Sequence, residues 1–286
     1  MRRTAIALAA VLAAGCAAGP APPGSAERVP AMTSAVPAVP PVPGIEAEAV
    51  RLRTDRAVGG QVQVRVTATG EESFTVIAVA LDSPGFAPLP AREVTAQFVP
   101  GRTIDLPAPY GDPVCGAAPE PAAARLTVAR PDGVPEDLRV PLAAEVLTLI
   151  HTEECAVEAV LEVVRIAVTG LAGAGDAVTG RLVLTRAGDD RRPVTVTDLR
   201  GSVVYGAAVG GLPLELRRDE DEVSSTVSFR AVSCDPHVLA DTKQPYVFPL
   251  QVVVGGAEPV AVDLPLDEQQ RGVLADLVDR TCGTGA

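Results

Sequence analysis

The sequence contains no tryptophan, no asparagine and a single lysine, Lys243, and its aromatic residues are limited to five phenylalanines and three tyrosines. Without asparagine there is no Asn-x-Ser/Thr acceptor for N-linked glycosylation. With so few aromatic rings, the chain has little material for a surface on which sugars or bases could stack. The formal net charge of −12 disfavours a partner that is held through phosphates, and we expect no nucleic-acid partner.

Catalytic motifs are also missing. No serine stands in a Gly-x-Ser-x-Gly frame, and Ala240 occupies the position where a Ser-x-x-Lys motif ending at Lys243 would need serine. Apolar residues still make up 47% of the sequence, so a core of valine, leucine, alanine and isoleucine is expected. Such a composition favours strands over large helices.

The first residues have the parts of a secretory signal. Arg2 and Arg3 precede an uncharged stretch, Thr4 to Gly15, which leads directly into Cys16. This stretch is too short to span a hydrocarbon layer of about 30 Å. We therefore predict a signal peptide at residues 1–15.

The run Leu12-Ala13-Ala14-Gly15-Cys16 resembles the lipobox of bacterial lipoproteins. The resemblance covers only the leader, and Ala13 stands where the family most often has leucine. It implies that Cys16 receives a diacylglyceryl group, that the signal is cut before Cys16, and that the new amino terminus is acylated, for example with palmitate. Two or three acyl chains anchor a protein firmly. The expected location is the extracytoplasmic face of the cell membrane, with Cys16 in the lipid.

A proline-rich segment follows the anchor. Residues 17–44 contain eight of the 27 prolines among small residues, a composition that cannot bury a core and prefers extended polyproline conformation. We predict that residues 16–44 form the lipid anchor and a tether.

The remaining sequence contains two similar halves. Each begins with an alternating apolar strand, a polar turn that contains glycine, and a second apolar strand. These segments are 61–68, 69–72 and 74–81 in the first half, and 182–184, 187–190 and 194–196 in the second. An internal duplication accounts for this better than chance.

Each half also ends in a helical pattern. Leu147, His151 and Cys155 are spaced at i, i+4 and i+8, as are Leu274, Val278 and Cys282. The sequence therefore predicts a mainly β fold: two tandem immunoglobulin-like β-sandwich domains, 45–157 and 158–286, each closed by a short C-terminal helix.

Four cysteines remain once Cys16 is lipidated, and four cysteines allow three pairings. Only one pairing respects the repeat and keeps each bond within its own half. We predict the disulfides Cys115–Cys155 and Cys234–Cys282, formed in an oxidising compartment.

The sequence patterns that could indicate a metal or cofactor site are incomplete. His151 lies near Cys155 and His237 near Cys234, but the two histidines are not equivalent in the repeat. The acidic run 219–222 lacks the glycine-punctuated loop of calcium motifs, and the glycines at 170–180 do not fit a dinucleotide-binding frame. We expect no metal, no cofactor and no catalytic residue.

The expected function is accordingly a non-catalytic, membrane-anchored binding or scaffolding module for a protein or another component of the cell envelope. Two alternatives stay open. One is a hydrolase of envelope material whose site the sequence does not display, and the other is a metal-handling protein that uses free cysteine thiols and histidine.

The anchor gives the first testable prediction. Replacing Cys16 with serine should release the protein from the membrane or leave the signal uncleaved, because serine cannot form the thioether. Mass spectrometry of the mature amino terminus measures this. An unmodified terminus at any residue after Cys16 would show that the chain is not a lipoprotein.

Overall fold

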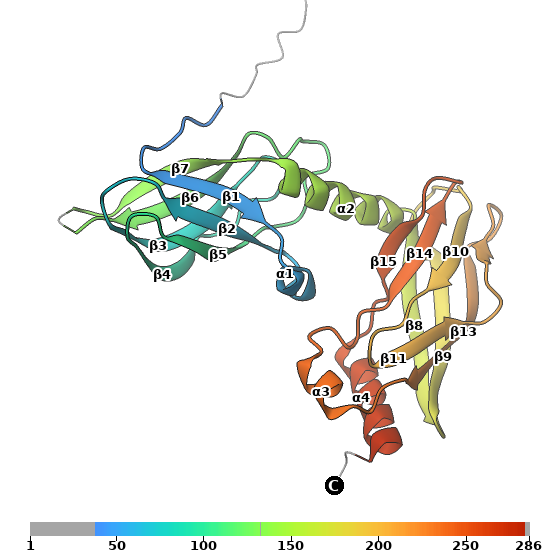
Figure 1. Ribbon diagram of the computed structural model, residues 1–286. Coiled ribbons are helices and arrows are strands. Elements are labelled where there is room, and N and C mark those ends of the chain that lie inside the picture. The colour runs from blue at the N-terminus through green and yellow to red at the C-terminus, as the bar shows by residue number, and fades with distance from the viewer. Residues whose placement is uncertain (1–37, 132, 284–286) are drawn as a thin grey trace, which may run out of the picture. The chain divides into compact units, whose positions relative to one another are not determined.

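The computed structural model describes residues 38–131 and 133–283, which fold mainly into antiparallel β-sheets (Figure 1). The predicted mainly β class is confirmed, as is a short helix at the C-terminal end of the described chain, α4 (Glu268–Cys282). The finer assignment to the immunoglobulin-like class and the domain boundaries stay predictions.

Two sheets form the first sandwich. One has the strand order β1-β2-β5 and the other β4-β3-β6-β7. The strands are β1 (Ile45–Val50), β2 (Gln61–Ala68), β3 (Phe74–Asp82), β4 (Arg92–Phe98), β5 (Thr103–Pro109), β6 (Ala122–Ala129) and β7 (Glu136–Leu142), and the short helix α1 (Arg53–Val58) joins β1 to β2.

Two further sheets form the second sandwich, with the strand orders β11-β13-β9-β8 and β12-β10-β14-β15. Their strands are β8 (Val164–Ala174), β9 (Ala177–Arg186), β10 (Val194–Leu199), β11 (Tyr205–Val209), β12 (Leu214–Leu216), β13 (Glu222–Ala231), β14 (Pro249–Val254) and β15 (Val260–Asp263). The other helices are α2 (Glu145–Leu161), which precedes β8, and α3 (Pro236–Asp241), which follows β13.

The sheet orders repeat between the halves. The order β1-β2-β5 corresponds to β8-β9-β13, and β4-β3-β6-β7 corresponds to β12-β10-β14-β15. The second half adds β11 at the edge of its first sheet. This correspondence supports the internal duplication predicted from the sequence.

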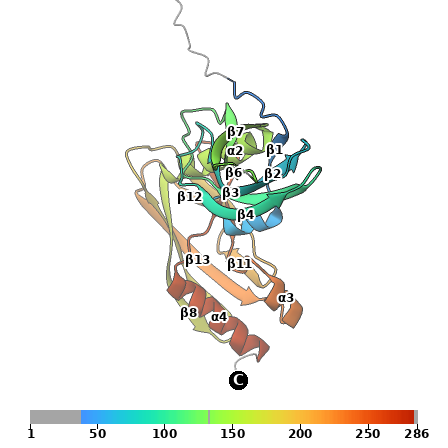
Figure 2. The same cartoon turned by 90° about the vertical axis from the view of Figure 1, so that its left-hand side faces the viewer.

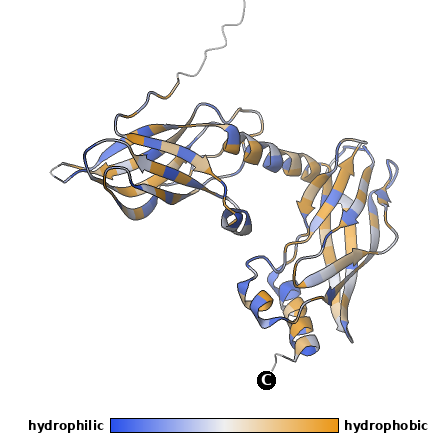
Figure 3. Cartoon of the chain, in the orientation of Figure 1, coloured by the Kyte–Doolittle hydropathy of each residue, from blue (hydrophilic) through white to orange (hydrophobic). Residues whose placement is uncertain are grey.

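Alternating side chains build both cores, and hydrophobic and hydrophilic positions follow one another along the strands (Figure 3). Along β2, Val62, Val64 and Val66 are fully buried, as a strand with one face on the core requires. Most of the few aromatic residues are buried. The rings of Phe74 and Phe98 stack with centroids 4.8 Å apart in the first core, and other phenylalanines occupy the second.

A helix closes each half. Leu147 and Ile150 of α2 are fully buried in the first core, and Leu274 and Leu277 of α4 are fully buried in the second. Helix α4 packs against β8, β9 and β13 (Figure 2). Its first turn has a capping box: the side chain of Asp267 accepts a hydrogen bond from the backbone of Gln270.

Both predicted disulfides are present. Cys115 is bonded to Cys155 with a Cα–Cα distance of 5.5 Å, and Cys234 is bonded to Cys282 with a distance of 5.3 Å. Each bond joins a loop to a closing helix, because Cys155 lies on α2 and Cys282 is the last residue of α4. The predicted pairing is therefore confirmed.

Helix α2 belongs to both halves. It runs without a break through the predicted boundary after residue 157. Val157 and Val160, near its end, pack against the core of the second sandwich, whereas Leu147 and Ile150 pack in the first. One continuous helix thus contributes to two hydrophobic cores.

A buried arginine holds the loops at one end of the second sandwich. Arg186 is only 6% exposed, and its guanidinium donates hydrogen bonds to backbone carbonyls. The acceptors are the carbonyls of Arg192, Leu216, Arg217 and Glu220. Three of these carbonyls belong to the β9–β10 and β12–β13 loops and that of Leu216 to the end of β12, so one side chain ties both loops to the end of β9.

The second testable prediction concerns this arginine. Arg186→Met keeps much of the side-chain volume but leaves one buried and three partly buried carbonyls without their donor, which should lower the free energy of unfolding by about 2–4 kcal/mol. Urea unfolding of the oxidised protein measures the change. Arg181→Met, which replaces an exposed arginine on the same strand, is the matched control and should cost less than about 0.5 kcal/mol. Equal losses in the two variants would contradict the assignment.

Candidate functional site

The lipid anchor predicted at Cys16 lies outside the described residues, and it stays a prediction. Within the described part of the chain, no helix combines the length and apolar character needed to cross a bilayer.

A groove of about 1240 Å³ lies beside the second half of α2. Its walls include the edge strand β8 of one sheet and the edge strand β15 of the other, both in the second sandwich. The larger apolar side chains that these three elements contribute to its wall are Val157 and Leu161 from α2, Val164 and Ile166 from β8, and Val260 and Val262 from β15. The groove is therefore mainly aliphatic where these three elements meet.

The backbone of β8 also faces this region. In an antiparallel pair, alternate residues bond to the partner strand and the others point away from it. The Val163 carbonyl accepts a hydrogen bond from the Ala187 N–H, beyond the end of β9, so Val163 belongs to the set bonded toward β9. Ile166 and Val168 belong to the other, outward set, whose backbone groups point away from β9. The Val168 carbonyl accepts a hydrogen bond of 2.7 Å from the Gln270 side chain. Ile166, one outward position earlier, lines the groove.

Alternate residues of β15 likewise have backbone groups that point away from the partner strand. Leu264 donates its N–H to the Phe248 carbonyl at 3.0 Å, which places Leu264 and Val262 in the set bonded toward β14. The backbone groups of Ala261 and Asp263 therefore point away from β14. Both residues line the groove, so two strand edges from two different sheets border it.

Most of the charged side chains near the groove form an ion pair or a hydrogen bond with another residue. Glu153 forms an ion pair with Arg51, and Glu154 accepts a hydrogen bond of 3.1 Å from the Tyr110 hydroxyl. Partial burial raises the pKa of Asp263, on β15. The described lining residues include no serine, cysteine or histidine. The groove can thus provide apolar contacts and strand edges to a ligand.

The first disulfide has polar neighbours on α2. The Cys155 sulfur lies 3.6 Å from His151 Nε2, and the Cys115 sulfur lies 2.9 Å from a Glu158 carboxylate oxygen. The half-buried His151 ring also packs edge-on against Phe86, with centroids 5.7 Å apart. Its Nε2 is 3.2 Å from the Val114 carbonyl.

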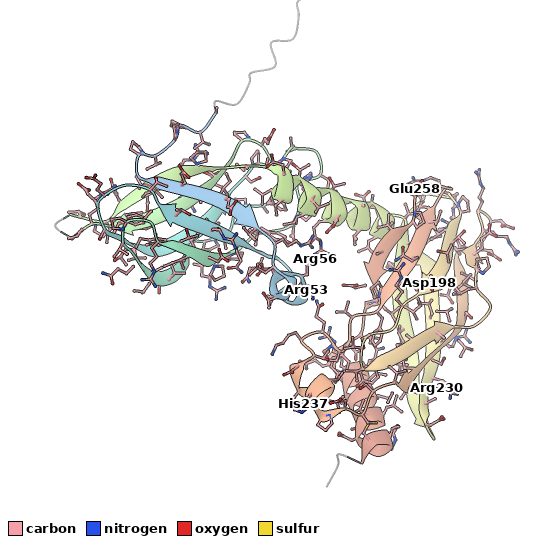
Figure 4. All side chains as sticks on the ribbon, viewed as in Figure 1. Arg53, Arg56, Asp198, Arg230, His237 and Glu258 are labelled. Atoms are coloured by element: carbon pink, nitrogen blue, oxygen red, sulfur yellow. A yellow bond between two sulfur atoms is a disulfide. The ribbon has the colours of Figure 1, made fainter. Side chains whose placement is uncertain are left out.

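The second disulfide has different surroundings. The Cys282 sulfur lies 3.9 Å from the Ser233 carbonyl. His237, labelled in Figure 4, is exposed at the start of α3, where its backbone N–H donates to the Asp235 side chain at 2.8 Å. His151 lies on α2 beside the first disulfide and His237 lies at the start of α3, so the structure does not bring the two histidines into one site.

The other sequence candidates have structural roles. In the acidic run, Asp221 pairs with Arg191 at 2.6 Å and Glu220 pairs with Arg217 at 2.7 Å, and the Arg191 guanidinium holds the pKa of Asp221 below its usual range. Gly170 lies at a register shift between β8 and β9, and Gly175 lies in the turn between them, both with positive φ. These glycines shape a hairpin.

Sequence reasoning missed the groove. The alternation of Val164, Ile166 and Val168 was a signal for a strand, but periodicity identifies the buried face of a strand and says nothing of an open edge. The lining also comes from segments far apart in the sequence, so no local motif could have revealed it.

The third testable prediction concerns Tyr110. Burial, with a smaller contribution from the Glu154 charge, raises the pKa of Tyr110 to about 12 from its ordinary value of 10.0. Because the pKa of Tyr110 is higher in the folded state, its contribution to stability is fully present below pH 10. This contribution is lost as the pH rises from 10 through 12. Glu154→Gln should lower the pKa of Tyr110, measured by the ultraviolet absorbance of tyrosinate.

Glu162→Gln, an exposed position just after α2, is the matched control and should leave the titration of Tyr110 unchanged. Tyr110→Phe should abolish this step and flatten the loss of stability between pH 10 and pH 12. An unchanged titration in Glu154→Gln would contradict the proposed coupling.

Comparisons with known proteins do not place the chain in a family. No family model matches the chain, and no curated protein matches it. Among solved structures, red sea bream transglutaminase is similar over 79% of this chain and 32% of its own, with 10% identity and a TM-score of 0.22. A protein of unknown function from Porphyromonas gingivalis W83 is similar over 77% of this chain and 97% of its own, with 14% identity and a TM-score of 0.18. The chain thus spans about a third of the transglutaminase, and neither likeness supports an argument about function.

Proposed function

We propose that this protein is a membrane-anchored, extracytoplasmic lipoprotein that acts as a non-catalytic binding or scaffolding module for a protein or another envelope component. The observation that carries the proposal is the aliphatic groove bordered by the open edges of β8 and β15. Lipid attachment at Cys16 would keep this groove outside the membrane on the tether of residues 16–44.

The groove suits an extended ligand. Outward backbone groups on a strand edge bind a peptide by adding it as a further strand, while neighbouring apolar pockets select its side chains. Here Ile166 on β8 and Ala261 on β15 supply outward backbone groups at the groove, and Leu161 on α2 supplies apolar surface that is 44% exposed. Exposed edges are usually blunted in monomeric proteins, so an edge left open beside apolar surface supports a binding role.

The hydrolase alternative has less support. Hydrolysis needs a nucleophile or an activated water together with an acid or a base. The carboxylates of Glu153 and Glu154 at the groove are held by Arg51 and Tyr110. Among the described lining residues, aliphatic side chains outnumber polar ones.

The fourth testable prediction concerns binding at the groove. Leu161→Arg should place a charge on the apolar wall and lower the yield of cross-linked partner, recovered from detergent-solubilised native membranes, by about tenfold, equivalent to about 1.4 kcal/mol. Leu149→Arg is the matched control, since Leu149 is 50% exposed on the same helix and does not line the groove. It should leave the yield unchanged.

Ala261→Pro separates strand addition from side-chain contact. Proline removes one outward N–H from the edge of β15 without removing a hydrogen bond to β14, so it should reduce capture of a peptide but not of a ligand held by apolar contact alone. Capture that is equal in the wild type, Leu161→Arg and Ala261→Pro, with all variants folded by circular dichroism, would refute a binding role for the groove.

A further inference from the structure

The two halves carry equivalent disulfides, and the sulfurs of the first lie close to an imidazole and a carboxylate of α2. Val278 occupies the repeat position of His151 in α4, and α4 ends at Cys282, before any counterpart of Glu158. The second disulfide therefore forms with valine at the position of His151 and with its helix ending before the position of Glu158. His151 and Glu158 therefore call for another explanation.

These groups are arranged like a set of metal ligands. His151, Cys155 and Glu158 follow one another at i, i+4 and i+7, so they share one face of α2. The potential donor atoms of Cys115, Cys155 and Glu158 all lie within 4.8 Å of one another, and the Cys155 sulfur is 3.6 to 4.0 Å from the two His151 ring nitrogens. Neighbouring ligand atoms around tetrahedral zinc are separated by about 3.3–3.8 Å, as follows from its bond lengths.

We propose that reduction of the Cys115–Cys155 disulfide creates a zinc-binding site with Cys115, Cys155, His151 and Glu158 as ligands. Two thiolates with one imidazole favour zinc over the hard cations magnesium and calcium. The site does not depend on the partner proposed for the groove.

The chemistry requires a dithiol reductant. One of its thiolates attacks a sulfur of the disulfide and forms a mixed disulfide, and its second thiol then closes a new disulfide within the reductant. The reductant is oxidised by two electrons, and Cys115 and Cys155 each gain one proton. Zinc binding then displaces both thiol protons into solvent. Cys115 is exposed, so its sulfur is open to attack.

The surroundings of His151 suit a ligand. When Nε2–H donates to the Val114 carbonyl, 3.2 Å away, Nδ1 keeps its lone pair for the metal. Nδ1 lies 4.0 Å from the Cys155 sulfur. The edge-on contact with Phe86 limits rotation of the ring. A backbone carbonyl thus selects the tautomer, which is the usual outer-shell arrangement for metal-bound histidine.

The test measures zinc binding to the full mature protein in its reduced and oxidised forms. The protein is reduced anaerobically with a phosphine, which contributes no thiol, and zinc retained after gel filtration is measured by mass spectrometry. We expect about one zinc per reduced chain and none per oxidised chain. Cobalt in place of zinc should give the charge-transfer absorption of thiolate ligands.

Variants identify the ligands. Cys234→Ser with Cys282→Ser should retain the metal, whereas Cys115→Ser with Cys155→Ser should lose it. His151→Val introduces the residue found at the repeat position and should weaken zinc binding by at least about tenfold. His237→Val, which replaces the exposed histidine near the other disulfide, is the matched control and should change nothing.

Several outcomes would overturn the proposal. They are the absence of zinc on reduced protein that keeps its circular dichroism spectrum, retention of zinc by the variant without Cys115 and Cys155, and unchanged affinity in both His151→Val and Glu158→Gln. Should reduction unfold the chain, zinc would bind any exposed thiols, and His151→Val and His237→Val would then behave alike. That equality would also refute a built site.

Discussion

The packing of a closing helix onto its sandwich is the interaction on which the rest of the structure depends. Few aromatic residues are available, so both cores consist mostly of aliphatic side chains, and leucines from α2 and α4 complete them. A short helix that packs through one apolar stripe tends to fray, and each disulfide holds one such helix against its sandwich. For sequence separations of 40 and 48, the chain-entropy contribution is about 4 kcal/mol per bond, comparable to the net stability of a domain.

Helix α2 connects this constraint to the proposed function. Its first half completes the first core, its middle carries Cys155, and its last turns pack on the second core and form a wall of the groove. Leu161 is available to a ligand because β8 and β15 are edge strands that leave this side of the second sandwich open. Both proposed sites therefore depend on the same helix, although they use different residues of it.

Much of this arrangement could be predicted from the sequence. Side-chain alternation predicted β2, a continuous apolar run predicted β3, and helical spacing before Cys155 and Cys282 predicted the closing helices. The repeat predicted the disulfide pairing, since an equivalent bond in each half is the simplest arrangement that a duplication allows.

The remainder depends on tertiary structure. Nothing local to Arg186 indicates that it is buried, because its carbonyl partners come from other loops. The strand β11 has no counterpart in the first half, so the repeat could not predict it. The groove depends on which strands lie at sheet edges, and periodicity does not encode strand order. The proximity of the Cys115 sulfur to Glu158 also appears only once the disulfide places a distant loop over α2.

The central claim is that each half is closed by its own disulfide-bonded helix, and peptide mapping of the native protein without reduction tests it most directly. The account predicts two cross-linked peptides, one joining Cys115 to Cys155 and the other joining Cys234 to Cys282. A peptide that joins Cys115 to Cys234 would contradict both the duplication and the closing role of the helices.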